Sequence, residues 1–121
     1  MRYVCLIYFD PKKVFNQSPE GNAVLADIPA FDEGLERSGH LVLAQPLTLP
    51  EEAVTVKVRD GKTSTTDGPF METKEMLGGF VVVEARDLNE AIEIASRIPF
   101  ARVGSVEVRS AVDRSRPRPR L

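Results

Sequence analysis

The sequence holds one cysteine, one histidine and no tryptophan among its 121 residues. One cysteine cannot form an internal disulfide, and one cysteine with one histidine cannot supply the usual four ligands of a zinc site. The carboxylates show no calcium-loop spacing, and no P-loop, dinucleotide-binding glycine fingerprint or nucleophile elbow occurs. No apolar run approaches the roughly 18 residues of a membrane-spanning helix. We therefore expect no metal, no cofactor and no membrane segment, and a cytoplasmic location is the default.

Charge is distributed unevenly along the chain. The formal net charge is −2, yet four arginines alternate with other residues within the last nine positions, so the rest of the chain is acidic. An acidic body has no general affinity for nucleic acid, and four tail charges supply only weak, salt-sensitive binding. Because a chain of this length fits one domain, we expect a single domain over residues 1–112, followed by a basic Arg/Pro-rich tail over 113–121. A nucleic-acid partner is not expected.

Alternating apolar residues and turn signals predict six strands. The strands are expected at residues 2–9, 41–47, 54–59, 62–66, 80–85 and 106–112. Asp60-Gly61 is typical of a two-residue hairpin turn, so the third and fourth strands should pair directly.

Two amphipathic helices are expected between the strands, over residues 19–37 and 88–98, because each follows a capping residue and carries one apolar stripe. Residues 12–17 are expected to be a loop. Pro29 leaves two possibilities for the first helix, which either bends there or begins only at Asp27. The order of elements predicts an α+β fold, a ferredoxin-like βαββαβ arrangement with an antiparallel sheet and an extra hairpin strand.

The first strand is apolar on both faces. One face carries Val4, Leu6 and Tyr8, and the other carries Tyr3, Cys5, Ile7 and Phe9. Two helices cover only one face of the sheet, and burial of apolar area at about 25 cal/mol per Å² favours covering the other with a second copy. The sequence therefore predicts a homodimer, a dimeric α+β barrel with a cavity between or beside the sheets. Cys5 is expected to be a buried, inert thiol.

A dense charged turn precedes the fifth strand. Asp67-Gly68-Pro69 is typical of a turn, because an Asp side chain can accept a hydrogen bond from the backbone that follows it, Gly accepts a positive φ and Pro fixes φ. Three ionisable residues follow closely, Glu72, Lys74 and Glu75. Gly78-Gly79 then allows close backbone approach at the start of the strand. We expect this stretch to border the cavity of the dimer.

This stretch resembles the defining motif of the DGPF family, a branch of the YCII-related proteins. The similarity rests on residues 66–75 (TDGPFMETKE) and 77–80 (LGGF), with further support from residues 3–8, 59–62, 87–91 and 104–109. The resemblance implies a ferredoxin-like, dimeric α+β barrel, and it implies an association with extracytoplasmic-function sigma factors, beside which members are often encoded. YCII-type relatives carry a His in the first helix with a nearby Asp as a proposed catalytic pair. The first helix here holds no His, so that pair is not carried over.

Asp67 and His40 are the candidate catalytic residues. Asp67 could act as a general acid or base, or bind a ligand, if it points into the cavity, and it could equally serve only to cap the turn. His40 is the one side chain whose unperturbed pKa lies near neutrality, but a histidine in a helix-to-strand turn is most often merely exposed. Candidate ligand-binding residues are Glu72, Lys74, Glu75, Tyr8 and Arg109, each with an equally simple alternative as a surface or packing residue.

Three hypotheses for function follow from these observations. The first is a cofactor-free dimer that binds a small polar molecule in a cavity bordered by residues 67–75. The second is an acid–base enzyme that uses Asp67, with His40 as a possible second group. The third is an interaction protein whose partner is a sigma factor.

Overall fold

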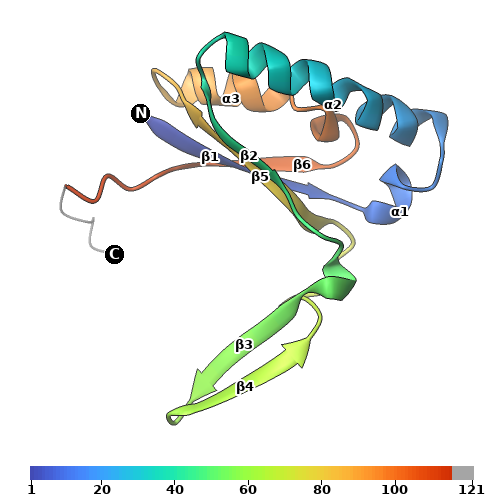
Figure 1. The fold of residues 1–121 in the computed structure, drawn as a ribbon, viewed down its shortest axis with the longest axis vertical. Coiled ribbons are helices and arrows are strands. Elements are labelled where there is room, and N and C mark those ends of the chain that lie inside the picture. Colours follow the sequence, from blue (N-terminus) through green and yellow to red (C-terminus); the bar gives the residue numbers. More distant parts are fainter. Residues whose placement is uncertain (116–121) are drawn as a thin grey trace.

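A computed structural model of the chain describes residues 1–115 (Figure 1). The elements in chain order are β1 (Arg2–Phe9), α1 (Pro11–Val14), α2 (Pro19–Arg37), β2 (Leu41–Pro46), η1 (Pro50–Glu52), β3 (Val54–Arg59), β4 (Lys62–Asp67), β5 (Met76–Glu84), α3 (Leu88–Ser96), η2 (Pro99–Arg102) and β6 (Ser105–Ser110). The tail predicted over residues 113–121 lies outside the described residues from position 116 onward.

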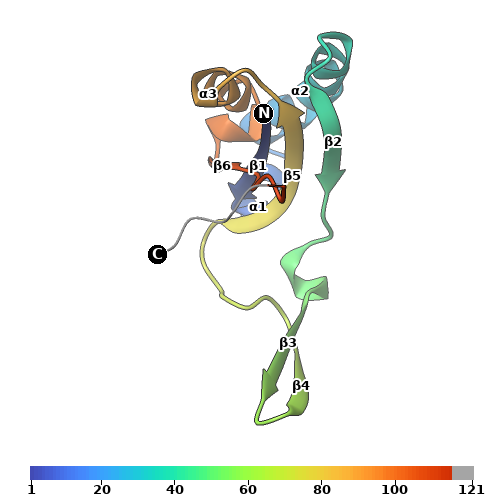
Figure 2. The ribbon, with the colours of Figure 1, turned by 90° about the vertical axis from the view of Figure 1, so that its left-hand side faces the viewer.

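Four strands form an antiparallel sheet in the order β2-β5-β1-β6. β1 lies inside this sheet, where Tyr3 is opposite Val83 of β5 and opposite Ser110 of β6. Helices α2 and α3 lie on one face of the sheet, and no helix within residues 1–115 covers the other face (Figures 1 and 2). This arrangement confirms the ferredoxin-like α+β fold expected from the sequence. We call the uncovered side of the sheet the helix-free face.

The two faces of β1 differ in burial as its alternation predicts. Tyr3, Cys5, Ile7 and Phe9 point toward the helices and are at most 6% exposed. They form the core with Val81 and Val83 of β5, with Leu35 of α2, and with Ala91, Ile94 and Ala95 of α3. The alternate residues of β1 lie on the helix-free face and are partly exposed: Val4, Leu6 and Tyr8.

Helix α2 begins where the capping signal places it. The hydroxyl of Ser18 accepts a hydrogen bond from the backbone N–H of Gly21 at 3.0 Å, and Pro19 occupies the first turn. The helix then runs to Arg37 and includes Pro29, which is exposed. A start only at Asp27 is therefore excluded.

Part of the segment expected as a loop, residues 12–17, is helical. Helix α1 occupies Pro11–Val14, and a carboxylate oxygen of Asp10 accepts a hydrogen bond from the N–H of Lys12 at 3.0 Å. Asp10-Pro11 thus both ends β1 and caps a helix, the same cap-then-proline pattern that begins α2. Val14 is fully buried and anchors this single turn to the core.

The hairpin predicted at Asp60-Gly61 is present, with φ values of 51° and 75° at the two turn residues. Positive φ at both positions matches the hairpin turns that suit twisted strands. β3 and β4 pair only with each other, in a separate two-stranded sheet. This hairpin projects from the helix-free side of the molecule (Figures 1 and 2). We call residues 54–67 the arm.

Candidate functional site

A mainly apolar pocket lies between α2 and the adjoining ends of β1, β2 and β5. Its volume is about 260 Å³. Residues from α2, the strands, the segment after β2 and η2 line it, including Leu25, Ile28, Asp32, Ile7, Phe9, Ala44, Pro46, Leu47, Leu49, Met76, Gly78, Gly79 and Phe100. We call this space the α2 pocket.

Aromatic rings form one wall of the α2 pocket. Phe9 stacks on Phe100 with ring centroids 4.4 Å apart and an interplanar angle of 9°, and it meets Phe15 edge-on at 5.9 Å. A Cβ added at Gly78 would lie 2.2 Å from Cε1 of Phe9, so the ring occupies the space that any side chain at position 78 would need. The glycine lets Phe9 pack flat against the start of β5.

Asp32 is the one ionisable side chain among the residues that line the α2 pocket. It lies one turn after Ile28 on α2 and is only partly exposed. Burial raises the pKa of the Asp32 carboxyl above its ordinary value, because the charged form loses solvation beside apolar neighbours. The site thus combines an apolar space with a single carboxyl that holds its proton more firmly than usual.

Two predicted site residues border a hollow on the helix-free side. Tyr8 and Glu75 line it together with Phe70, Ser105 and Glu107. The hydroxyl of Ser105 donates a hydrogen bond to Oε1 of Glu75 at 2.8 Å, which joins the charged turn to β6. The hollow is open in this single chain, at the junction between the sheet and the arm.

Two more predicted residues, Glu72 and Lys74, border a neighbouring open hollow. Its other charged lining residues are Asp10, Lys12 and Glu51. Asp67 lines none of these spaces. It is the last residue of β4, is exposed, and lies opposite Val54 on the arm. The structure therefore places Glu72 and Lys74 at one hollow and Tyr8 and Glu75 at the other, and Asp67 at neither.

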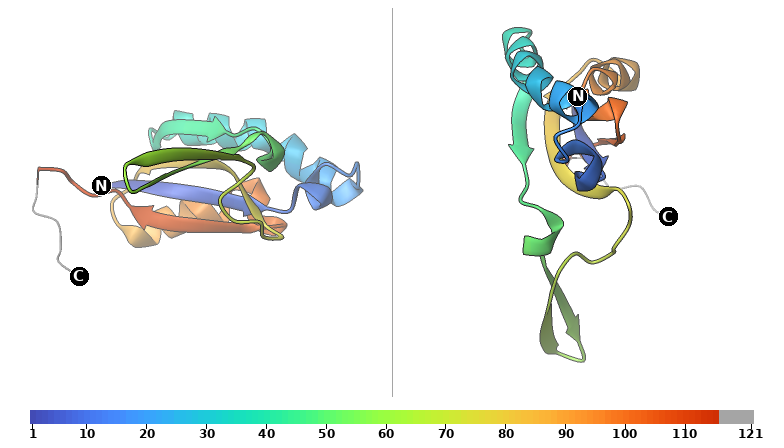
Figure 3. Two further views of the ribbon diagram at one scale, coloured as in Figure 1. Left: turned by 90° about the horizontal axis from the view of Figure 1, so that it is seen from below. Right: turned by 90° about the vertical axis from the view of Figure 1, so that its right-hand side faces the viewer.

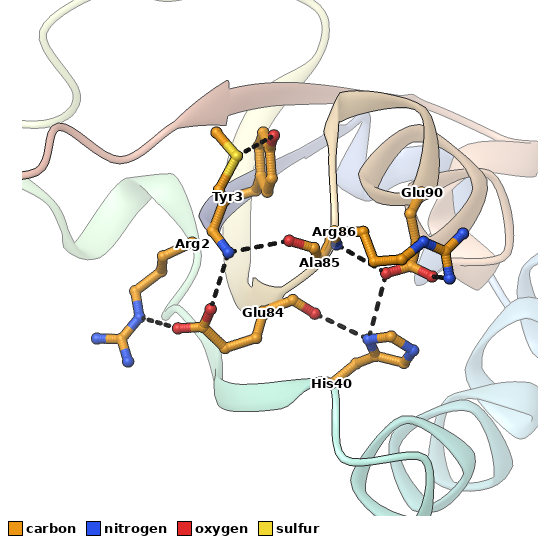
Figure 4. Close-up of polar contacts among 8 residues, drawn as sticks. Arg2, Tyr3, His40, Glu84, Ala85, Arg86 and Glu90 are labelled. Carbon is orange, nitrogen blue, oxygen red and sulfur yellow. Dashed lines mark hydrogen bonds and ion pairs between the residues drawn. The ribbon is translucent and has the colours of Figure 1, made fainter.

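His40 lies immediately before β2, in a network of contacts with backbone and charged groups (Figure 4). Its Nδ1 is 2.8 Å from the carbonyl oxygen of Glu84 and 3.9 Å from Oε1 of Glu90. Glu90 also pairs with Arg86 at 2.6 Å and accepts a hydrogen bond from the Arg86 backbone N–H. These contacts tie α3 to the strand ends, and His40 lines none of the three spaces described above.

Arg109 lies on β6 opposite Val4 and is exposed. Its Nε is 3.7 Å from a carboxylate oxygen of Glu107 on the same strand. An exposed pair of this kind contributes little to stability. Glu107 borders the hollow of Tyr8, whereas Arg109 does not.

Sequence reasoning missed Asp32 and the α2 pocket. The apolar stripe of this helix runs through Val24, Ile28, Phe31 and Leu35, and this pattern alone places Asp32 on the polar surface of the helix. The signal that was present is its spacing: Asp32 follows Ile28 by four residues and so continues the same face of the helix. A lone carboxyl at the edge of an apolar stripe could have been singled out on that ground.

Neither a metal centre nor a membrane span is found in the part of the chain that the structure describes. No three His, Cys, Asp or Glu side chains of residues 1–115 are grouped so that they could hold a metal ion. None of the helices in that range is long and apolar enough to cross a membrane.

Comparison with known proteins gives three findings. The YCII-related domain matches residues 1–114. An uncharacterised protein of Rhizobium meliloti is 34% identical over 112 residues, which cover 90% of each chain. A solved structure is also similar in fold: 5-chloro-2-hydroxyhydroquinone dehydrochlorinase of Burkholderia phenoliruptrix, in complex with 2,5-dihydroxybenzoquinone. The TM-score is 0.54 and the sequence identity is 16%, and the match covers 93% of this chain and 94% of that chain. The chain belongs to the family of YCII-related proteins.

Proposed function

We propose that this protein binds a small molecule, about the size of one substituted six-membered ring, in the α2 pocket, with Asp32 as the group that contacts its polar substituent. The observation that carries the proposal is a single carboxyl of raised pKa in an otherwise apolar pocket. Ligand sites are typically apolar spaces with a few placed polar groups, and such a carboxyl is a candidate functional group.

The size of the pocket limits the ligand. A cavity of about 150 Å³ accommodates benzene, and the α2 pocket measures about 260 Å³. One ring with two or three small substituents fits this space, whereas a nucleotide does not. The stacked Phe9 and Phe100 rings provide a flat apolar wall for such a ring.

The chemistry available to the bound molecule is acid–base chemistry at Asp32. A carboxyl whose pKa is raised keeps its proton to a higher pH than an ordinary aspartic acid and so has a proton to donate to a bound ring, and its ionised form accepts one from a ring hydroxyl. The structural neighbour named above acts on a hydroxylated ring, which agrees with the size of the pocket. Asp32 rather than Asp67 is the carboxyl that the geometry favours for this role.

The proposal changes the ligand expected from the sequence. A polar molecule bordered by residues 67–75 was expected, whereas the α2 pocket is apolar and contacts only the continuation of that stretch, Met76 to Val81. Binding at Glu72, Lys74 and Glu75 stays a prediction, as does a sigma-factor partner.

The test compares Asp32→Asn with the matched variant Glu33→Gln, which removes a neighbouring exposed charge from the same helix. Binding of 2,5-dihydroxybenzoquinone and of mono- and dihydroxybenzenes is measured by NMR titration of the full chain. We expect shifts to concentrate at amides of Ile28, Ala44 and Gly79, and Asp32→Asn to weaken binding at least tenfold while Glu33→Gln leaves it unchanged. Shifts centred elsewhere would reject the pocket, and equal binding by both variants would reject the role of Asp32.

A further inference from the structure

A hollow of mixed charge adjoins the α2 pocket. Its volume is about 550 Å³, and the ionisable residues that line it are Asp10, Lys12, Glu51, Glu72 and Lys74. Pro11, Pro50 and Met76 line this hollow and the α2 pocket alike, so the two spaces share an apolar wall. We call the space lined by the five ionisable residues the charged hollow.

Three separate segments of the chain bring these charges to one place. Asp10 and Lys12 lie at the junction of β1 and α1, and Glu51 lies on η1. The other two charges come from the segment that joins the arm to β5, residues 68–75. Figure 3 shows this segment running from the end of β4 back to the start of β5. The charged hollow is therefore formed by the fold and not by one run of charged sequence.

The opposite charges of this hollow are not paired with one another. Within residues 1–115, no ion pair or hydrogen bond engages the side chains of Lys12, Glu51, Glu72 and Lys74. Exposed opposite charges do pair elsewhere in the chain, as Arg102 does with Asp27 at 2.9 Å. Ammonium and carboxylate groups that line one hollow without meeting can each bind the opposite charge of a ligand that enters between them.

The two adjoining spaces differ in what they offer a ligand. No residue of α2 lines the charged hollow, and none of the five charged residues lines the α2 pocket. A molecule that spans both spaces thus contacts Asp32 only through the part inside the apolar pocket. It contacts charges of both signs only through the part inside the charged hollow.

We propose that the two spaces together bind one hydroxyphenyl α-amino acid, with its ring in the α2 pocket and its ammonium and carboxylate groups in the charged hollow. The inference rests on the proposed function, which it deepens by naming the class of ligand. The ring hydroxyl contacts Asp32, as the proposed function requires. Lys12 and Lys74 suit the carboxylate of the amino acid, and the glutamates suit its ammonium group. A simple phenol occupies only the α2 pocket.

The test compares free tyrosine with p-cresol, which has the same hydroxyphenyl ring and neither charge. Each is titrated into the full chain and followed by NMR. We expect tyrosine to shift the amides of both Ile28 and Lys74, and p-cresol to shift that of Ile28 alone. Tyrosine should bind at least tenfold more tightly than p-cresol, and tyramine, which lacks the carboxylate, should fall between them.

Two pairs of matched variants identify the charges that act. Lys12→Gln is compared with Lys13→Gln, and Glu51→Gln with Glu52→Gln; both control residues are exposed and line neither space. Because a single exposed charge contact contributes little, we expect Lys12→Gln and Glu51→Gln each to weaken tyrosine binding about threefold. The two control variants should bind tyrosine as the wild type does, and all four variants should bind p-cresol with unchanged affinity.

The outcomes separate this inference from the proposed function. If p-cresol binds in the α2 pocket and tyrosine binds no more tightly, the inference is wrong and the proposed function stands. Tyrosine shifts at Lys74 with none at Ile28 would also overturn it, because one ligand would then not span both spaces. Binding of neither compound would refute both proposals. Asp32→Asn should weaken both compounds by the same factor, whereas Lys12→Gln should affect tyrosine alone.

Discussion

Gly104 stands where β6 begins and lies against the end of β1. A Cβ added at this position would lie 2.1 Å from the carbonyl oxygen of Tyr8 and 3.0 Å from Cα of Phe9. Both neighbours are backbone atoms, so no side-chain rotation relieves the overlap. We therefore expect Gly104→Ala to push the start of β6 away from β1 and to disturb the last pair of their ladder, Tyr8 with Ser105.

The size of the effect follows from overpacking. Inserting a methyl group into a filled site costs typically about 1–3 kcal/mol, and a contact with backbone belongs at the upper end of that range. For a chain of this length each kcal/mol corresponds to about 3–6 °C in Tm. Gly104→Ala is expected to lower the free energy of unfolding by about 2–3 kcal/mol, measured in urea at one fixed protein concentration.

Gly34 provides the matched control. It lies within α2, and no atom lies within 4 Å of the position where a Cβ would be added. Alanine is preferred to glycine inside a helix by about 0.5–1 kcal/mol, so Gly34→Ala should raise stability. The same chemical change thus has opposite signs at two positions. A Gly104→Ala protein as stable as Gly34→Ala would refute the close approach of β6 to β1.

Three further predictions concern single groups. The hydrogen bond from Arg2 lowers the pKa of the Glu84 carboxyl below its ordinary value of 4.5. The ionised carboxylate therefore stabilises the fold above pH 4.5, and this stabilisation is lost as the pH falls through the lowered pKa. In acid titrations, the difference in free energy of unfolding between wild type and Glu84→Gln should close below pH 4.5. Burial raises the pKa of Cys5 to about 11, so the thiol should resist a disulfide reagent at pH 8 until guanidinium unfolds the chain. Gly78→Ala should displace the Phe9 ring and weaken ring binding in the α2 pocket severalfold by NMR titration; unchanged affinity would contradict the packing described.

Much of the fold could be predicted because local signals and burial agree. β1 is found at Arg2–Phe9 as expected, and the caps at Ser18 and Asp87 begin α2 and α3. α1 was missed although Asp10-Pro11 carries the same cap-and-proline signal as the start of α2. The two signals differ in what precedes them: Asp10 directly follows the apolar strand of residues 2–9, and an Asp-Pro pair at the end of a strand is more simply interpreted as a turn.

The candidate site was harder to predict, because its walls come from distant parts of the chain. The α2 pocket joins Ile28 and Asp32 to strand ends near Ala44 and Gly78, and periodicity within one element does not show how such ends meet. Charge density, by contrast, is visible in sequence and drew attention to Glu72, Lys74 and Glu75. Those residues are partly or fully exposed at two open hollows.

The dense stretch from Asp67 to Phe80 has a structural explanation that needs no catalytic role. Gly68 closes the base of the arm with φ of 104°, where its N–H donates to the carbonyl oxygen of Ala53 at 2.6 Å. A residue other than glycine is strained in that conformation. The chain must then return to the sheet and enter β5, where Gly78 fits beneath the Phe9 ring. The same stretch therefore joins the arm to the wall of the α2 pocket, and Gly68 and Gly78 are the residues that this path requires.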